Sequence, residues 1–302
     1  MKLLQALVFV VGGLLAVHAD AQQAASAAPT QFVEITGKRI AYRSIGQGAP
    51  MIVLNRMRGT LDTWDPLFLD ELAKSNRIVT VDYPGVGYSA GALPPEIGQV
   101  ASFVAAFADA LGLERFVLAG WSWGGTVAQT FLVEHPGRAT HAVLIGTAPP
   151  GKGRVPIQQA FLDRALKPVN DFDDEVVLFF EPNSAVSRSA ARASHERIYA
   201  RPGVTEKIPS KREEIEAFLK AAETYRNDAA GRLEKLKATR TPILIISGDN
   251  DISTAVENWF DLKGRIPNAH LIVYPESGHA PQHQYPELAA AQIALFQRLA
   301  LP

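Results

Sequence analysis

The chain has 302 residues, of which 47% are hydrophobic and 8% aromatic, and its formal net charge is -1. That length and composition are typical of a globular protein with one large domain and a full core, and they exclude a disordered chain. The near-neutral charge excludes a basic footprint for nucleic acid and a polybasic stretch for anionic membranes, and the absence of cysteine from the sequence excludes disulfides, thiol catalysis and thiolate metal sites.

The start of the chain predicts an export signal over residues 1–21. Lys2 supplies a positive charge, an apolar run follows over residues 3–17, and Ala19-Asp20-Ala21 places small residues at the positions that a signal peptidase reads. We therefore expect cleavage before Gln22 and an exported protein, periplasmic or secreted, with no stable membrane anchor. An uncleaved anchor is the alternative, but the apolar run is shorter than the roughly 20 residues that span a bilayer. Residues 22–31, rich in alanine, glutamine and serine, predict a flexible tail.

Short apolar runs alternate with helical patterns in two stretches, residues 32–151 and 239–302. The runs are near-continuous, as in strands buried on both faces of a parallel sheet, and they cover Met51–Leu54, Ile78–Val81, Phe116–Leu118, Ala142–Ile145, Ile243–Ile246 and Leu271–Tyr274. Amphipathic helices lie between them, and a last helix from Pro286 is expected to bury Leu288, Leu295, Phe296 and Leu299. Such alternation predicts an α/β fold with a mostly parallel central sheet and helices on both faces.

The third of these runs leads into Gly120-Trp121-Ser122-Trp123-Gly124, a G-x-S-x-G motif with a strand before it and a helical pattern after it. A sharp strand-to-helix turn lifts the serine out of the sheet, and the glycines leave room for that turn. The amide groups at the start of the following helix then lie beside the hydroxyl, where negative charge develops when a serine attacks a carbonyl. The motif therefore predicts that Ser122 is a nucleophile.

The alternation stops between Pro149 and Thr241, where no run has comparable strand character. Residues 152–238 are mostly helical in pattern and more charged, and we interpret them as a helical cap over the carboxyl edge of the sheet. The segment Val176–Phe180 is unusually apolar for this region. It is either a helix packed on its neighbours or a contributor, through Phe179, to a substrate pocket.

A serine nucleophile needs a base, and the base needs a group that orients it. Two strand ends carry such groups: Asp249 and Asp251 follow the strand at Ile243–Ile246, and His279 follows the strand at Leu271–Tyr274. Open α/β sheets build their sites at the carboxyl ends of strands. His279 and His283 also have the spacing of a metal pair on a helix, but Pro281 between them and the lack of a zinc-pattern glutamate argue against a metal site.

These motifs resemble those of α/β-hydrolases of the serine-nucleophile branch, which include esterases and cofactor-free haloperoxidases. The resemblance covers about residues 32–301 apart from the insertion, and it rests on the chain order Ser, Asp, His and on Gly248-x-x-Asp251, Ser277-Gly278-His279 and Asp82-Tyr83-Pro84-Gly85. It implies that Ser122, His279 and Asp251 form a catalytic triad, with Asp249 as the alternative acid. It also implies a reaction that needs no cofactor and no metal.

The segment after the first strand departs from the pattern of that family. Family members usually have His-Gly there, whereas this chain has Asn55-Arg56, followed by Met57-Arg58-Gly59. By position, the resemblance implies that the backbone N–H groups of Met57 and Trp123 form the oxyanion hole, since backbone donors survive a change of side chain. Arg56 or Arg58 either faces the pocket and favours an acidic substrate, or is a solvated or ion-paired side chain. Trp64, Trp121 and Trp123 are expected to wall the site with apolar surface, and Trp64 and Trp121 are alternatively ordinary packing residues.

The residues and the resemblance together predict a serine hydrolase that cleaves a carboxylic ester or lactone through an acyl-enzyme on Ser122. Peroxide in place of water would make the same triad a haloperoxidase-like perhydrolase, and hydrolysis of a carbon–carbon bond is a further alternative. Ser122 excludes the aspartate nucleophile of relatives that dehalogenate or open epoxides. A protein that only binds a small ligand on this fold is the alternative outside enzymes, and the complete triad argues against it.

Overall fold

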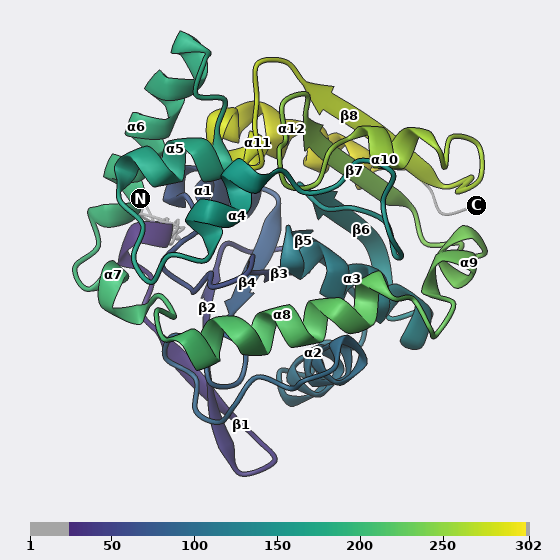
Figure 1. Cartoon of the computed structure of the whole chain (residues 1–302). Coiled ribbons are helices and arrows are strands. Elements are labelled where there is room, and N and C mark those ends of the chain that lie inside the picture. The colour runs from purple at the N-terminus through teal and green to yellow at the C-terminus, as the bar shows by residue number, and fades with distance from the viewer. Residues whose placement is uncertain (1–23, 300–302) are drawn as a thin grey trace, which may run out of the picture.

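The computed structural model describes residues 24–299 (Figure 1), so the predicted export signal lies outside the described residues. Eight strands form one sheet in the order β1-β2-β4-β3-β5-β6-β7-β8. Their bounds are β1 Gln31–Ile35, β2 Lys38–Ile45, β3 Ala49–Leu54, β4 Asn76–Val81, β5 Phe116–Trp121, β6 Ala139–Ile145, β7 Ile243–Gly248 and β8 Ala269–Tyr274. The pairs β1–β2 and β2–β4 are antiparallel and the others are parallel. The predicted α/β fold with a mostly parallel sheet is confirmed.

The six predicted strands are β3 to β8, and the hairpin of β1 and β2 at the edge of the sheet was not predicted. In β2 the residues alternate between buried and partly exposed positions after an exposed start at Lys38. An alternating strand lacks the continuous apolar run that marks a strand buried on both faces. The hairpin therefore gives a weaker signal in the sequence than the central strands.

Helices cover both faces of the sheet. One face carries α2 (Ile97–Ala110) and α3 (Trp123–Glu134), and the other carries α1 (Pro66–Ala73) and α12 (Pro286–Phe296). Helix α1 begins with a side-chain cap, because the Asp65 carboxylate accepts the N–H of Leu67 at 3.0 Å and Pro66 occupies the first helical position. These helices form a hydrophobic core with each face of the sheet, and this packing fixes the positions of the strand ends.

The expected buried stripe of the last helix is wrong for three of its four residues. Phe296 is 5% exposed, but Leu288, Leu295 and Leu299 are 48%, 65% and 44% exposed. The other buried residues of α12 are Pro286, Ala289, Ala290 and Ile293. Helix α12 packs closely on α1, and small side chains at that contact leave the larger leucines on the outer side.

Six helices lie between β6 and β7, within the stretch predicted to form the cap. They are α4 Gln159–Ala165, α5 Phe172–Phe179, α6 Ala185–Tyr199, α7 Val204–Lys207, α8 Arg212–Arg226 and α9 Arg232–Lys237. In Figure 1, α4, α5 and α6 lie together at one end, whereas the long α8 runs beside α2 and α3. Two short helices complete the fold, α10 (Glu257–Phe260) and α11 (Pro281–Gln284), and α11 packs on α6.

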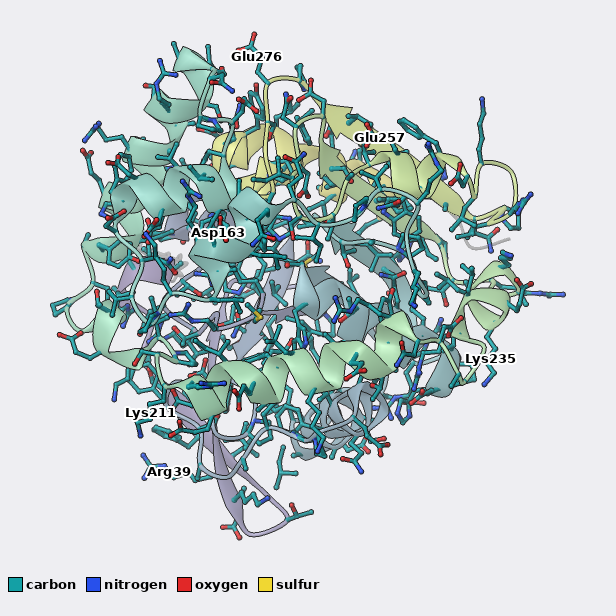
Figure 2. The ribbon with its side chains drawn as sticks, viewed as in Figure 1. Arg39, Asp163, Lys211, Lys235, Glu257 and Glu276 are labelled. Carbon is teal, nitrogen blue, oxygen red and sulfur yellow. The ribbon has the colours of Figure 1, made fainter. Side chains whose placement is uncertain are left out.

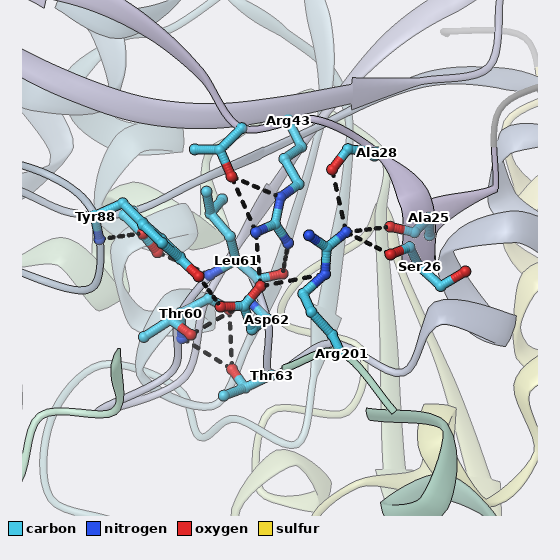
Figure 3. Close-up of polar contacts among 12 residues, drawn as sticks. Ala25, Ser26, Ala28, Arg43, Thr60, Leu61, Asp62, Thr63, Tyr88 and Arg201 are labelled. Atoms are coloured by element: carbon cyan, nitrogen blue, oxygen red, sulfur yellow. Dashed lines mark hydrogen bonds and ion pairs between the residues drawn. The ribbon is translucent and has the colours of Figure 1, made fainter. Parts of the chain in front are cut away.

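Of the tail predicted to be flexible, residues 22–31, the structure describes residues 24–31, and these contact α1 and the insertion. A short 3-10 helix, η1 (Ala25–Ala27), packs on α1, and the N–H of Ala25 donates to the Asp70 carboxylate at 2.7 Å. Figure 3 shows the Arg201 guanidinium donating to the carbonyls of Ala25, Ser26 and Ala28, at 3.2, 2.6 and 3.1 Å. An arginine of the insertion thus holds the N-terminal segment, a contact that local composition cannot reveal.

A buried ionic cluster joins this segment to the core. The Asp62 carboxylate lies 2.6 Å from the Arg43 guanidinium and 3.6 Å from that of Arg201, and the Tyr88 hydroxyl donates to it at 2.7 Å (Figure 3). Two ion pairs and a hydrogen bond that reach a buried carboxylate from different sides offset part of the cost of burying it. The cluster ties β2, the loop before α1 and the insertion together.

Charged side chains of both signs are distributed around the molecule. Those labelled in Figure 2 come from separate elements and loops: Arg39, Asp163, Lys211, Lys235, Glu257 and Glu276. Within residues 24–299, no helix is both long enough and apolar enough to cross a bilayer.

Candidate active site

Ser122 occupies the sharp turn between β5 and α3. Its backbone has φ 56° and ψ -117°, a conformation that non-glycine residues rarely adopt. The glycines on either side permit the turn, because a Cβ on Gly120 would lie 2.3 Å from the Gly124 carbonyl oxygen and a Cβ on Gly124 would lie 2.3 Å from that of Leu54. Backbone strain of this kind persists only where the surroundings enforce it, and it is common at functional residues.

The side chain of Ser122 is hydrogen-bonded to His279, and His279 to Asp251. The Ser122 Oγ lies 2.7 Å from the His279 Nε2, and the His279 Nδ1 lies 2.8 Å from the Asp251 Oδ2. Both the histidine and aspartate side chains are almost fully buried. The structure therefore brings together the three residues that the sequence nominated for the triad, from the ends of three different strands.

Asp251 is held as an ionised acceptor. Its Oδ1 accepts the N–H groups of Ser253 and Thr254, each at 2.8 Å, and its Oδ2 accepts the Thr254 hydroxyl at 2.8 Å. Burial by itself raises the pKa of a carboxyl, but the charge interaction with His279 and these hydrogen bonds outweigh burial and lower the pKa of Asp251. Thr254 was not nominated from the sequence; an Asx-type turn after Asp251 would have been its only signal.

Asp249, the alternative acid, stabilises the turn after β7. Its carboxylate accepts the N–H of Ser277 at 3.1 Å and the side-chain amide of Asn250 at 2.8 Å, and the residue is exposed. It therefore connects the loop after β7 to the loop that carries His279. The geometry assigns the contact with His279 to Asp251.

The two backbone N–H groups nominated for the oxyanion hole are free to donate. Among residues 24–299, neither the N–H of Met57 nor that of Trp123 donates a hydrogen bond. Trp123 is the first residue of α3, where the N–H groups have no partner inside the helix and carry the positive end of the helix dipole. An oxyanion formed next to Ser122 would supply the missing acceptor.

Asn55, which stands where the family usually has histidine, is a structural residue. It is 1% exposed, its side-chain amide donates to the Val81 carbonyl at 2.9 Å, and its amide oxygen accepts the indole N–H of Trp64. The Tyr83 hydroxyl donates to the Asn55 carbonyl at 3.2 Å. Asn55 therefore fixes the start of the loop that carries Met57.

The expectation that Arg58 faces a substrate pocket is not met. The residue is 3% exposed, and its guanidinium donates to the carbonyls of Pro209, Lys167 and Pro168 at 2.7, 2.7 and 2.6 Å. A further bond reaches the Ala165 carbonyl at 3.1 Å. Because backbone carbonyls of the insertion use these donors, Arg58 fastens the insertion to the loop after β3. Burial lowers its pKa from the ordinary value.

Trp64 also lies outside the pocket, whereas Phe179 lines it. Trp64 is 3% exposed and packs against Phe68 and Trp121, so the structure supports the packing interpretation. A small pocket lies between the core and helices α5 and α6. Residues of the core and of the insertion form its wall, among them Arg56, Trp121, Phe179, Ser194, His195 and His283.

Most of these lining residues were not nominated from the sequence. Arg56 was considered beside Arg58, but the residues of α6 gave no signal because pattern alone does not place a helix over a sheet. His283 was considered only as half of a metal pair. Its Nε2 accepts the N–H of Asp65 at 3.3 Å, and no cluster of three or more potential metal-ligand side chains occurs among residues 24–299.

Comparison with known proteins agrees with this fold. A family model described as alpha/beta hydrolase fold matches residues 49–286. The chain is similar to the pimeloyl-[acyl-carrier protein] methyl ester esterase of Nitrosomonas europaea, with 27% identity over 265 residues, covering 82% of this chain and 95% of that protein. An alpha/beta hydrolase fold protein from Chitinophaga pinensis superposes with a TM-score of 0.83 and 30% identity, covering 92% of this chain and 100% of that one.

A third relative is matched over only part of its length. It is the dihydrolipoyllysine-residue acetyltransferase component of the acetoin cleaving system of Cupriavidus necator, 35% identical over 180 residues. The match covers 56% of this chain and 45% of that protein.

Proposed function

Because this chain belongs to the alpha/beta hydrolase fold family, we propose that it is a serine hydrolase that cleaves a carboxylic ester or lactone through an acyl-enzyme on Ser122. The observation that carries the proposal is the continuous chain of hydrogen bonds from Ser122 through His279 to Asp251, at 2.7 and 2.8 Å. A serine hydroxyl is a weak nucleophile unless a base removes its proton, and this arrangement provides the base.

In the proposed reaction, the Ser122 Oγ attacks the carbonyl carbon of the substrate while the His279 Nε2 accepts the hydroxyl proton. Asp251 keeps the proton of the neutral imidazole on Nδ1 and stabilises the imidazolium that forms. The N–H groups of Met57 and Trp123 bind the oxyanion of the tetrahedral intermediate. Collapse of that intermediate releases the alcohol, which takes its proton from His279. Water activated by the same histidine then releases the acid and restores Ser122.

A relative supports an ester as the substrate. The Nitrosomonas europaea protein is named as a methyl ester esterase, and the chain covers 95% of its length. From this relative we take only the class of reaction, which is the cleavage of an ester. We do not propose an acyl carrier protein as part of the substrate. The expected partner is a small-molecule substrate.

The proposal is tested by hydrolysis of p-nitrophenyl esters from acetyl to dodecanoyl, with protein that starts at Gln22 and with its Ser122→Ala variant. We expect turnover that falls at least about 10³-fold in the variant, since the nucleophile is lost while the rest of the site remains. The chain-length profile measures how much acyl chain the protein accommodates. No turnover of any ester or lactone by folded protein would refute the proposal.

Assays with other substrates and reagents separate the alternative functions. Product formation that requires added hydrogen peroxide would favour a perhydrolase, and cleavage of a vinylogous 1,5-diketone without ester turnover would favour a carbon–carbon hydrolase. A folded protein that is inert to all of these and to serine-reactive phosphonates would favour a ligand-binding role.

We also propose that the protein is exported, on the sequence of residues 1–21. Expression of the full chain and N-terminal sequencing of the protein from the periplasm and medium tests this. A mature chain that starts at Gln22 is expected, and full-length protein confined to the cytoplasm would contradict export.

A further inference from the structure

The pocket beside the triad contains hydrogen-bond donors that have no acceptor. Arg56, Ser194 and His283 contribute to its wall. Within the described residues, the Arg56 Nε and the Ser194 Oγ are buried atoms without a hydrogen-bond partner. Buried polar groups are normally satisfied, so these two groups require acceptor atoms from outside the protein, which an ordered water or a bound ligand supplies.

Arg56 brings a positive charge to this pocket. Its guanidinium stacks on Phe179 and Trp121, with 4.6 and 5.4 Å from the guanidinium carbon to the ring centroids. One nitrogen, Nη1, donates to the Met57 carbonyl at 2.9 Å. No carboxylate lies within 4.0 Å of the guanidinium among residues 24–299. Burial lowers the pKa of Arg56 to about 10, which leaves it cationic at neutral pH.

The acidic residue in the wall is already occupied. Glu175 accepts the Tyr199 hydroxyl, and its other carboxylate oxygen lies 2.7 Å from the His195 Nδ1. Both carboxylate oxygens therefore contact residues of the insertion, and neither lies within 4.0 Å of the Arg56 guanidinium. A ligand that satisfies Arg56 must bring its own acceptor atoms.

His283 adds a third donor. Its Nε2 accepts the backbone N–H of Asp65, so that nitrogen is unprotonated in the neutral ring and the proton is on Nδ1. Burial lowers its pKa to about 4, so the neutral form prevails at pH 7. The pocket thus offers a guanidinium, a hydroxyl and an imidazole N–H, a donor set that suits the oxygens of a carboxylate.

The pocket lies near the histidine of the triad, because the ring centroid of Trp121, which lines the pocket, is 6.2 Å from that of His279. Arg56 precedes Met57, whose N–H is nominated for the oxyanion hole, and Trp121 precedes Ser122. On the insertion side, the Phe179 carbonyl accepts the N–H of Ala280, the residue after His279, at 2.8 Å. A substrate whose ester carbonyl lies at Ser122 would therefore reach this pocket through a short chain.

We propose that this pocket binds a carboxylate of the substrate, so that the preferred substrates are esters or lactones that carry a second, ionised carboxyl group. The inference rests on the proposed ester hydrolysis and adds the substrate class. Arg56 supplies the charge, and Ser194 and His283 supply further hydrogen bonds. The aromatic rings of Phe179 and Trp121 keep the guanidinium in place and away from bulk water.

The test compares monomethyl esters of the dicarboxylic acids from succinate to suberate with methyl alkanoates of equal chain length. The measured quantity is the ratio of kcat/KM for the acidic ester to that for the neutral one. The wild type is expected to prefer the acidic series, with an optimum length that measures the distance from Ser122 to Arg56. Arg56→Met should lower the ratio about 10- to 100-fold, and Ser194→Ala by a smaller factor.

Arg188→Met is the matched control, because it removes an exposed arginine of α6 by the same substitution. It should leave the ratio unchanged. If Arg56→Met lowers kcat/KM equally for acidic and neutral esters, Arg56 only supports the Met57 carbonyl, and the inference is overturned. A wild type without preference for acidic esters would also overturn it.

A binding measurement separates this inference from the proposed function. Calorimetric titration of the Ser122→Ala protein with monomethyl adipate requires no turnover. Binding that is lost in Ser122→Ala with Arg56→Met supports the carboxylate site even if no ester is hydrolysed, in which case only the proposed reaction fails. If the wild type hydrolyses neutral esters but Ser122→Ala does not bind monomethyl adipate, the carboxylate site is refuted and the proposed reaction is not. If Arg56→Met does not fold, Ser194→Ala carries both measurements.

Discussion

The indole N–H of Trp121 donates to the backbone carbonyl of His279 at 2.8 Å. The residue that precedes the nucleophile therefore holds the backbone of the residue nominated as general base, although the two are far apart in the sequence. Both are buried, and their ring centroids lie 6.2 Å apart. Ser122 and His279 thus have a common support as well as a direct hydrogen bond.

Trp121→Phe is expected to lower kcat about tenfold and the free energy of unfolding by about 1–2 kcal/mol. The substitution retains an aromatic ring but removes the donor, which leaves a buried carbonyl unpaired and His279 less precisely placed. Ester hydrolysis and urea denaturation measure the two effects. Trp259→Phe is the matched control, since the buried Trp259 donates to the Thr147 carbonyl at 2.6 Å. It should cost similar stability but little kcat, and equal losses of kcat in both variants would contradict the support role.

Arg58→Met is expected to loosen the insertion without unfolding the core. The variant loses the bonds to the carbonyls of Pro209 and of the segment Ala165–Pro168, which join the insertion to the loop after β3. A local loss of about 1.4 kcal/mol makes the open form tenfold more populated. Limited proteolysis should therefore cut residues 165–170 at least about tenfold faster, and KM for esters should rise. Arg188→Met serves again as the control, and unchanged proteolysis of Arg58→Met would refute this role.

Arg201→Met is expected to release the N-terminal segment. Its guanidinium donates to three carbonyls of residues 25–28 and lies 3.6 Å from the Asp62 carboxylate, so the variant leaves both without this partner. We expect a loss of about 1 kcal/mol, which lowers Tm by roughly 2–4 °C. Protein that starts at Gln31 loses the same three carbonyl contacts, so the loss on combining the two changes should be smaller than the sum of the separate losses. Arg212→Met, which breaks an exposed ion pair on α8, should leave Tm unchanged.

The central sheet and the triad were predictable because their signals are local. The strands β3 to β8 are continuous apolar runs, and Ser122, Asp251 and His279 each lie in a short motif at a strand end. Parallel strands bring their carboxyl ends to one edge, so chain order alone was enough to place the three side chains together.

The contacts made by the insertion were not predictable in this way. Whether Arg56 or Arg58 reaches the pocket depends on which carbonyls of the insertion lie within reach, and no periodicity encodes that. The order of residues 24–31 likewise depends on Arg201, more than 170 positions away along the chain. In α12, packing against α1 favoured alanines over the leucines that hydrophobicity alone would bury.

His283 makes the stability of the fold depend on pH. The ring is buried, with its centroid 4.7 Å from that of Trp121, and burial lowers its pKa to about 4. In the unfolded chain a histidine binds its proton near pH 6.5, so between pH 6.5 and 4 the unfolded state binds more protons than the folded state. The contribution of neutral His283 to stability is therefore complete above pH 6.5 and is lost as the pH falls toward 4, by about 3 kcal/mol in total.

His283→Gln retains an acceptor for the Asp65 N–H but does not titrate, so it should abolish this dependence. The quantity to compare is the free energy of unfolding in urea, wild type minus variant, at pH 7, 6, 5 and 4. Burial also raises the pKa of Asp82 to about 7, which acts in the opposite direction over the same range, but this effect is common to both proteins and cancels in the difference. A difference for His283→Gln that does not change with pH would mean that the ring accepts a proton in the folded protein as readily as in the unfolded chain, and that burial does not keep it neutral.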